Sequence, residues 1–466
     1  MGLMCPPLKN RYEFLTEGNF NLNHIARIFI SLSCKLVDTF ESIQPPNDDI
    51  PRLIHYVNDE IAEKLFHTAF MLQAKSPVDK IYGLYGLLTV YCNIPLPAPD
   101  YTKTAADVYE ETVWAWISDR NDLSILKLAT RSDYIHELPS WVPAWHREHP
   151  NFINKKTSHP FMELNPERYM AFSYGHFAWA YKARDDMRLA SWEEAQKFGP
   201  IATLMSPGKL RILRARYVGM VSHAIGIDEP GNYFETINYY HLHLRWCRLI
   251  HDVFSHSTPK FKGALHEMFR SLQLPGIYEH TNMDAQSAEE EAEMFRSWFD
   301  FMLYVDRALP PPTSTSSSIY DGRMPPRSAI TGGKGGGLYY YMIKGRGEEN
   351  AEAVLKEYYD GDVKGREGIA NLARNVRKVH LDLIRVRNHA LCILDNDNMI
   401  AVANYWCREG DEVFVFPGTD CPFILRREPD GDSYRLVGPA LVDRLYRTGY
   451  QNWRTEGDDL QVVTLV

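Results

Sequence analysis

The residues that decide the fold are five short apolar segments near the C-terminus. They read Leu391-Cys-Ile-Leu394, Met399-Ile-Ala-Val-Ala403, Glu412-Val-Phe-Val-Phe416, Phe423-Ile-Leu-Arg426 and Tyr434-Arg-Leu-Val437. The stretches between them, such as Asp395-Asn-Asp-Asn398 and Pro429-Asp-Gly-Asp432, consist of residues that favour turns. Short β-rich runs at this spacing are typical of a small barrel or sandwich. We therefore expect residues 380–445 to form a compact antiparallel β module.

Helical patterns precede this module. Apolar residues at three- and four-residue spacing predict a helix over residues 53–74. Two sequences with the form of a capping box, Ser76-Pro-Val-Asp79 and Thr104-Ala-Ala-Asp107, predict helices over residues 77–91 and 104–118. The expected fold class is α+β, with helical N-terminal and middle regions and a small antiparallel β barrel or sandwich module near the C-terminus.

Two glycines, Gly83 and Gly86, stand inside the second predicted helix. Glycine in a helix interior costs about 1 kcal/mol relative to alanine. A close approach by the backbone of another element would account for both positions. We therefore expect such a contact at this helix.

The chain divides into four expected regions. Residues 1–150 form a helical region, and residues 151–309 form a mixed, mainly helical region that also carries strand-like sequence at 210–223. Residues 310–337 are rich in Pro, Ser and Gly, which is typical of a flexible loop. Residues 338–466 contain a helix followed by the β-rich module.

Composition narrows the class of protein. The chain has 466 residues, of which 45% are hydrophobic and 24% charged, as in soluble globular proteins. Lys and Arg number 51 against 60 Asp and Glu, so the net charge is -9 and a nucleic-acid partner is not expected. No apolar stretch reaches the ~18 residues of a membrane span, and the N-terminus lacks a secretory signal. Seven scattered cysteines without a Cys-x-x-Cys pair favour a reducing compartment, so we expect a cytoplasmic protein without membrane contact.

Motifs for cofactor or metal binding are weak. Gly332-Gly-Lys334-Gly335 resembles a phosphate-binding loop but lacks the Ser or Thr that should follow the lysine. His243, Cys247 and His251 would lie on one side of a helix, yet three ligands spread over two turns rarely converge on one ion. Gly-x-Ser-x-Gly and His-Glu-x-x-His motifs are absent from the sequence. We expect neither a cofactor nor a metal.

The candidate functional residues come from the first third of the chain. The catalytic candidates are Asp79, Asp100 and Tyr101, because a carboxylate beside a proline-rich loop could bind an amine or act as a general base. The alternative is that Asp79 only caps the helix begun by Ser76. The binding candidates are the aromatic residues Tyr82, Tyr109, Trp141 and Trp145. These residues either line a ligand pocket or are buried core. We expect Trp141 and Trp145 to be largely buried, pinning their proline-rich segment onto the helices around Tyr82 and Tyr109.

Several motifs occur in a fixed order that resembles a known family. They are Ser76-Pro-Val-Asp-Lys-Ile-Tyr-Gly-Leu-Tyr-Gly-Leu87, Pro99-Asp-Tyr101 and Leu138-Pro-Ser-Trp-Val-Pro-Ala-Trp145. This order resembles the region downstream of the HET domain in fungal heterokaryon-incompatibility proteins. Gly410-Asp-Glu-Val-Phe-Val-Phe-Pro-Gly418 and Tyr434-Arg-Leu-Val-Gly438 resemble the β-rich tail of the same proteins.

The resemblance implies a function but omits the family's effector. In that family a TIR-like HET domain precedes these motifs and carries the death-signalling or nucleotide-cleaving function. Only about 75 residues precede Ser76 here, so we expect the HET domain to be missing or truncated. The implied function is a recognition or regulatory module in incompatibility or a related process, with an unknown protein partner or small-molecule ligand. The alternative is an enzyme that adopted the HET-like scaffold in fungal secondary-metabolite biosynthesis, of the condensation, acyl-transfer or cyclisation type.

Overall fold

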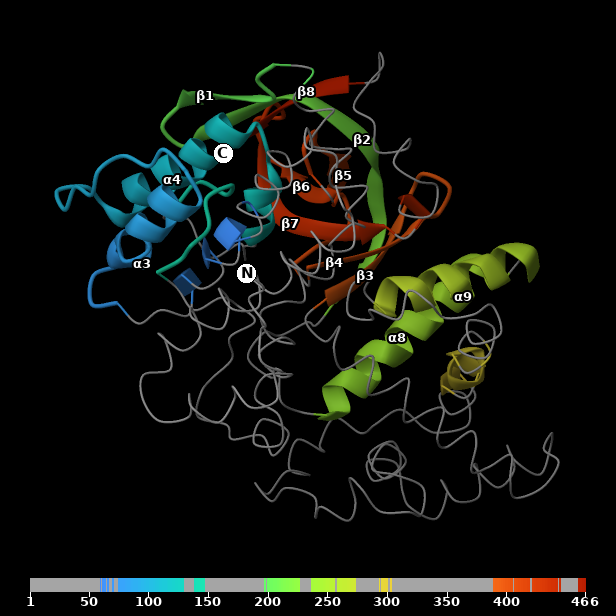
Figure 1. Cartoon of the computed structure of the whole chain (residues 1–466). Coiled ribbons are helices and arrows are strands. Elements are labelled where there is room, and N and C mark those ends of the chain that lie inside the picture. The colour runs from blue at the N-terminus through green and yellow to red at the C-terminus, as the bar shows by residue number, and fades with distance from the viewer. Residues whose placement is uncertain are drawn as a thin grey trace, which may run out of the picture.

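The structure is a computed structural model. It describes residues 74–129, 138–146, 199–226, 236–255, 258–273, 389–404, 406–419, 421–442 and 460–466, with separate positions at 59–70, 197, 293–303 and 444–445. The described part is α+β: helices flank an antiparallel sheet, as Figure 1 shows. The loop expected at 310–337 and the helix expected before the β-rich segments lie outside the described residues.

Six strands pair in an order that returns to its starting strand. The eight strands are β1 Ala202–Ser206, β2 Lys209–Ile225, β3 His389–Leu394, β4 Ile400–Asn404, β5 Glu412–Val415, β6 Phe423–Arg427, β7 Tyr434–Val442 and β8 Leu460–Leu465. The order runs β2-β3-β4-β7-β6-β5, and β5 pairs again with β2. Every pairing within this ring is antiparallel. The antiparallel β module expected near the C-terminus is therefore present, with one strand added from the middle of the chain.

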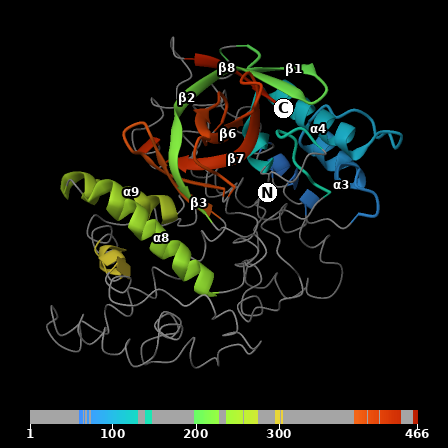
Figure 2. The same ribbon diagram turned by 180° about the vertical axis from the view of Figure 1, so that it is seen from behind.

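That added strand, β2, is 17 residues long and pairs with four others. Its first half lies between β1 and β8, and its second half pairs with β5 and β3. In Figures 1 and 2 it curves along one side of the sheet. The strand-like sequence at 210–223 is confirmed, but its pairing with strands more than 160 residues later has no local signal.

The turns between the C-terminal strands follow the sequence. Asp397 and Asn398 take positive φ angles of 53° and 49° in the β3–β4 turn. Gly410 and Gly431 take φ angles of 88° and 78° in later turns. Asn, Asp and Gly are the residues that adopt this left-handed conformation at the lowest cost, so these turn predictions are confirmed.

Alternate residues along the ring strands belong to two apolar clusters. Leu391 and Ile393 of β3 belong to a large cluster that also contains the helices. Ala390 and Cys392 belong to a second cluster of mostly small residues, to which all six ring strands contribute. Both faces of β3 and β4 are therefore buried, one in the cluster that contains the helices and one against the other ring strands, whereas β2 also carries exposed residues.

The N-terminal helices confirm one capping prediction. Helix α4, Ala105–Arg120, begins at a complete capping box in which Thr104 and Asp107 bond to each other's backbone N–H groups. Short helical segments flank it: α3 Asp79–Tyr82, a π-helix at Leu87–Tyr91 and a 3-10 helix at Ser124–Leu128. The described positions between 59 and 70 are also helical, as the predicted helix at 53–74 requires.

The capping box predicted at Ser76 is wrong. Helix α3 starts at Asp79 after Val78, without a side-chain cap. Ser76 and Pro77 instead form turns, in which their carbonyls accept the N–H groups of Asp79 and Lys80. The sequence predicted one helix over residues 77–91, but the structure has two short helical segments there, α3 and the π-helix.

The backbone contact predicted at Gly83 and Gly86 is also wrong. A Cβ built on Gly83 would lie 2.8 Å from the carbonyl oxygen of Asp79, one turn earlier in the same segment. A Cβ built on Gly86 would meet open space. No backbone of another described element approaches either glycine; the close contact at Gly83 is with its own segment.

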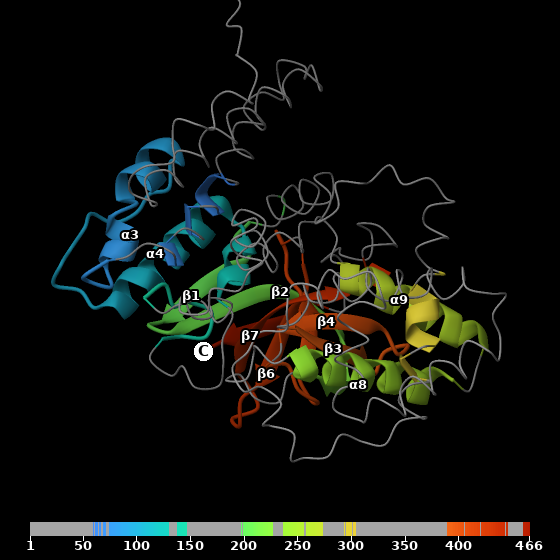
Figure 3. The same ribbon diagram turned by 90° about the horizontal axis from the view of Figure 1, so that it is seen from below.

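Helices α8, Thr236–Phe254, and α9, Thr258–Gln273, lie on the side of the sheet away from the N-terminal helices, as Figures 1 and 3 show. A buried carboxylate fastens α9 to the ring. Glu267 accepts the N–H of Ile400 at 3.0 Å and an Arg444 guanidinium N–H at 3.0 Å. The sheet is thus held between two helical groups.

Candidate functional site

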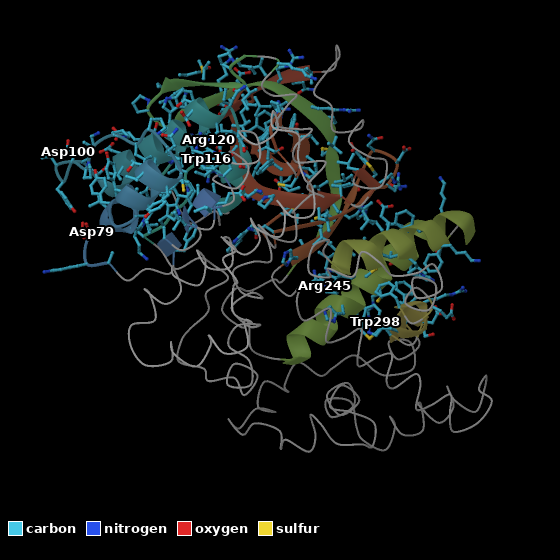
Figure 4. All side chains as sticks on the ribbon, viewed as in Figure 1. Asp79, Asp100, Trp116, Arg120, Arg245 and Trp298 are labelled. Carbon is cyan, nitrogen blue, oxygen red and sulfur yellow. The ribbon has the colours of Figure 1, made fainter. Side chains whose placement is uncertain are left out.

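The three catalytic candidates lie together at the surface. The Tyr101 hydroxyl donates to Asp79 Oδ1 at 3.2 Å, although 22 residues separate them in sequence. The Tyr101 side chain is 69% exposed. In Figure 4, Asp79 and Asp100 lie at the outer edge of the N-terminal helices. The sequence therefore grouped these residues correctly, and the structure places the group on an open surface.

The Asp100 carboxylate is hydrogen-bonded within its own loop. Its Oδ1 accepts the N–H of Thr102 at 2.9 Å and the Thr102 hydroxyl at 2.6 Å. These hydrogen bonds stabilise the carboxylate and lower the pKa of Asp100 below its usual value. A carboxylate with a lowered pKa is a weak proton acceptor, so Asp100 is suited to shaping the loop more than to general-base chemistry.

Tyr82 anchors this loop from below. Its hydroxyl donates to the Asp100 carbonyl and accepts the Asp100 N–H, both at 3.0 Å. Its ring packs edge-to-face on Tyr101, with centroids 5.2 Å apart. The Asp79 carboxylate, hydrogen-bonded to Tyr101, raises the pKa of the Tyr101 phenol, which keeps it protonated as a donor. Tyr82 thus orients both Asp100 and Tyr101.

The segment before these residues forms an exposed ridge. Ile94 and Leu96 are buried, whereas the prolines at alternate positions are exposed. We call Pro95, Pro97, Pro99 and Tyr101 the proline ridge. Each proline fixes its own φ near -65° and keeps the preceding residue extended. The ridge is therefore a rigid, largely apolar surface bordered by the Asp79 carboxylate.

Exposed apolar side chains recur in the sequence that leads into this ridge. Among the described residues, seven large apolar side chains are exposed, and three of them lie between positions 90 and 101. These are Val90 at 75%, Tyr91 at 59% and Tyr101 at 69% exposure. Clustered apolar exposure marks surfaces that bind other molecules, whereas scattered single residues carry no such meaning.

The remaining aromatic candidates lie in the core. Tyr109, Trp141 and Trp145 are all fully buried. The Tyr109 ring packs edge-to-face on Trp145 with centroids 5.2 Å apart. The burial predicted for the two tryptophans is confirmed.

The polar atoms of these buried aromatic residues are also satisfied. The Tyr109 hydroxyl donates to the Pro77 carbonyl at 2.7 Å, and the Trp145 indole N–H donates to the Phe66 carbonyl at 3.0 Å. The Trp141 indole N–H donates to the Gly208 carbonyl at 3.1 Å, which joins this segment to the β1–β2 turn. Their geometry is that of core residues, so only Tyr82 of the four aromatic candidates shares a surface with the polar ones.

The sequence did not predict the buried ion pair between Arg120 and Asp59. Arg120 lies 2.9 Å from Asp59, with both side chains less than a tenth exposed, and it also donates to the Cys92 carbonyl. Burial raises the pKa of the Cys92 thiol to about 12. In Figure 4 Arg120 lies inside the N-terminal helices, beside Trp116. Arg120 thereby fixes the point where the chain leaves the π-helix and enters the ridge. The only sequence signal for this role was the position of Arg120 in the last turn of a helix.

A hollow of about 640 Å³ opens between α9 and the β3–β4 turn. Its charged lining includes Lys260, Glu267, Asp395 and Arg444. Glu267 accepts hydrogen bonds from Ile400 and Arg444, and Asp395 accepts the N–H of Met220 at 2.8 Å. These carboxylates fasten α9 and β2 to the β3–β4 hairpin.

The three residues spaced like metal ligands do not converge. His243 is buried beside Trp246 and Trp298, with ring centroids 5.3 and 6.2 Å away. His251 lies near Asp252, at 3.3 Å. Within the described part of the chain, no three His, Cys, Asp or Glu side chains gather as a metal site requires.

The comparisons with known proteins add no identity. No protein-family model, curated protein or solved structure matches this chain. Among the residues that the structure describes, the helices are too short or too polar to cross a membrane. The chemistry of the site therefore rests on its own geometry: a rigid proline ridge, a fixed exposed tyrosine and a neighbouring carboxylate.

Proposed function

We propose that this chain is a HET-like recognition or regulatory module, acting in fungal incompatibility or a related process. One observation carries the proposal: the candidate polar residues lie on an exposed rigid ridge, while Tyr109, Trp141 and Trp145 are sealed in the core. The ordered motifs shared with heterokaryon-incompatibility proteins supply the biological context. A protein partner fits such a ridge better than a small molecule, which needs a concave site.

The ridge would recognise its partner through preorganisation. The prolines have already lost the backbone freedom that binding would otherwise remove. Tyr101 is oriented by Tyr82 and Asp79, so its exposed ring offers a large contact area with few rotamers to fix. Asp79 would pair with a Lys or Arg of the partner at the rim, which favours correct orientation and fast association.

The β module would serve as the scaffold for this ridge. We propose that the ring β2-β3-β4-β7-β6-β5 is a closed small barrel. Support comes from the return of β5 to β2 and from the apolar cluster to which all six strands contribute. A cytoplasmic location is supported by the five described cysteines, which carry thiols instead of disulfides.

The enzyme alternative, a HET-like scaffold adopted for secondary-metabolite biosynthesis, would require an enclosed reactive site. In the described part of the chain, the carboxylate of the candidate Asp100 is hydrogen-bonded to Thr102, and its pKa is lowered. Tyr101 is exposed to solvent, where a reacting carbonyl or acyl group would not be shielded from water. These features favour recognition over catalysis.

Affinity purification of the full chain from a filamentous-fungal host tests the proposal. A partner should co-purify with the wild type and be lost with Tyr101→Ala or with Pro97→Ala. Lys262→Ala, on the exposed side of α9, is the matched control and should retain the partner. Equal recovery of the partner with all four proteins would show that the ridge does not bind it.

A further inference from the structure

A second surface, opposite in charge character to the chain as a whole, lies on β1, β2 and β8. These three strands contain no Asp or Glu, although the chain has 60 of them. The first half of β2 carries four cationic residues, Lys209, Arg211, Arg214 and Arg216. We call the outer side of β1, the first half of β2 and β8 the basic face. Its charge contrasts with the net charge of -9.

Strand register places an exposed cation at the centre of this face. Arg211 is exposed and pairs with Thr203 of β1 on one side and Thr464 of β8 on the other. Directly opposed residues in a sheet point to the same side, so Arg211 is flanked by two hydroxyl groups. Lys209, also exposed, lies two residues before it in β2.

The basic face also exposes apolar side chains. Met205 of β1 is 56% exposed and Val462 of β8 is 50% exposed. Among the described residues, Tyr217 and Met220, farther along β2, are the other exposed large apolar residues outside the 90–101 segment. A charged surface with exposed aliphatic groups suits a polypeptide, whose side chains can supply both kinds of contact.

We propose that the basic face docks an extended acidic segment of a partner protein. Among the described strands, β1 pairs only with β2, so its outer edge can accept the backbone of an added strand. Carboxylates at alternate positions of that strand would lie on the side of the sheet that carries Arg211 and Lys209. This surface is separate from the proline ridge, so the proposal does not depend on the proposed function.

A nucleic acid fits this face less well. The net charge of -9 repels a polyanion at long range, and phosphate binding draws on many cations. Single strands also need aromatic side chains on which bases can stack. Tyr217 is the only Phe, Tyr or Trp of β1, β2 and β8, and its ring already packs edge-to-face on Phe414, with centroids 5.5 Å apart.

Fluorescence anisotropy with the full chain tests the proposal. The probe is a labelled octapeptide of alternating Glu and Val, and its counterpart has Lys in place of Glu. The Glu peptide should bind, more weakly as salt is raised, and the Lys peptide should not. The double variant Lys209→Glu/Arg211→Glu should weaken binding by about tenfold or more. Lys260→Glu/Lys262→Glu makes the same charge change on α9 and should leave binding unchanged.

Two further variants test whether the loss of binding comes from misfolding or from another surface. Arg211→Gln, a milder change that keeps the strand polar, should weaken binding by a smaller factor even if the double variant folds poorly. Tyr101→Ala should not alter it, which separates this surface from the ridge. Equal binding by the two double variants would overturn the proposal. Tighter binding of single-stranded DNA or phosphatidylserine vesicles, lost with Lys209→Glu/Arg211→Glu, would also overturn it and assign the face to polyanions or membranes.

Discussion

The Tyr101 hydroxyl donates to Asp79 Oδ1 at 3.2 Å, joining the end of the proline ridge to the first residue of α3. The bond is exposed, so solvent competes for both partners and its contribution to folding is small. Its effect is to hold the tyrosine ring in one orientation beside a carboxylate. Position, more than stability, is therefore what this pair provides.

Asp79→Asn should separate these two roles. The amide oxygen still accepts the Tyr101 hydroxyl, so the free energy of unfolding in urea should fall by less than about 1 kcal/mol. The charge offered to a partner is lost, so partner recovery should fall. Tyr101→Phe keeps the ring and the charge, and it should retain more of the partner than Asp79→Asn. A stability loss above about 2 kcal/mol would make Asp79 a structural residue instead.

Trp145→Ala should destabilise the chain by about 3–5 kcal/mol, because the ring is fully buried against Phe66 and Tyr109. Trp145→Phe keeps much of the packing but leaves the Phe66 carbonyl without its indole donor, so it should cost less. Urea unfolding followed by circular dichroism measures both. A loss below about 1 kcal/mol for Trp145→Ala would place this tryptophan in an open site.

The buried Asp411–Arg426 pair should show strong coupling. Arg426 Nε lies 2.8 Å from Asp411 Oδ1, and a second guanidinium N–H donates to Oδ2 at 3.0 Å. Asp411→Ala leaves the guanidinium buried and unpaired, so it should cost about 3–5 kcal/mol. The double variant Asp411→Ala/Arg426→Met should cost less than the sum of the single variants in a denaturation cycle. Additive losses would mean that the two charges do not interact.

Cys92 should make stability fall in alkaline solution. Burial raises the pKa of its thiol from 9.0 to about 12, so between these pH values the unfolded chain has lost a proton that the folded chain keeps. Stability from this group is complete below pH 9 and declines as pH rises toward 12. The difference in unfolding free energy between wild type and Cys92→Ala should therefore shrink from pH 8 to pH 11. Val113→Ala, a buried truncation without a proton, should show a constant difference; equal pH dependence in both variants would contradict this assignment.

Local sequence signals predicted local structure well where no distant contact competed. Thr104 and Asp107 bond as a capping box because the helix that they begin, α4, is long and regular. Ser76 has a similar sequence around it, but the carbonyl of the next residue, Pro77, accepts the Tyr109 hydroxyl from α4. That tertiary bond accompanies a tight turn at the place where the sequence predicts a cap.

Strand pairing across the chain could not be predicted in the same way. The residues of β2 indicate a strand, but nothing in Lys209–Ile225 specifies β3, β5 and β8 as its neighbours. Such pairings are set by the burial of whole strand faces. The buried Asp411–Arg426 pair was missed for the same reason, since 15 residues and a strand change separate its members.

The candidate site was half predictable. Asp79, Tyr82, Asp100 and Tyr101 were singled out from sequence, and the structure brings them together. Their exposure was not predictable, because aromatic residues near carboxylates occur both in pockets and on surfaces. Trp141 and Trp145 occupy the core with their N–H groups paired, a distinction that only the packing reveals.

Metabolite profiling of a filamentous-fungal host distinguishes recognition from catalysis. Strains expressing the wild type, Asp79→Asn or no protein are grown in parallel, and their extracts are compared by mass spectrometry. We expect identical metabolite profiles, with any wild-type effect confined to growth or cell fusion. A new product that appears with the wild type and disappears with the folded Asp79→Asn variant would contradict it and establish an enzyme.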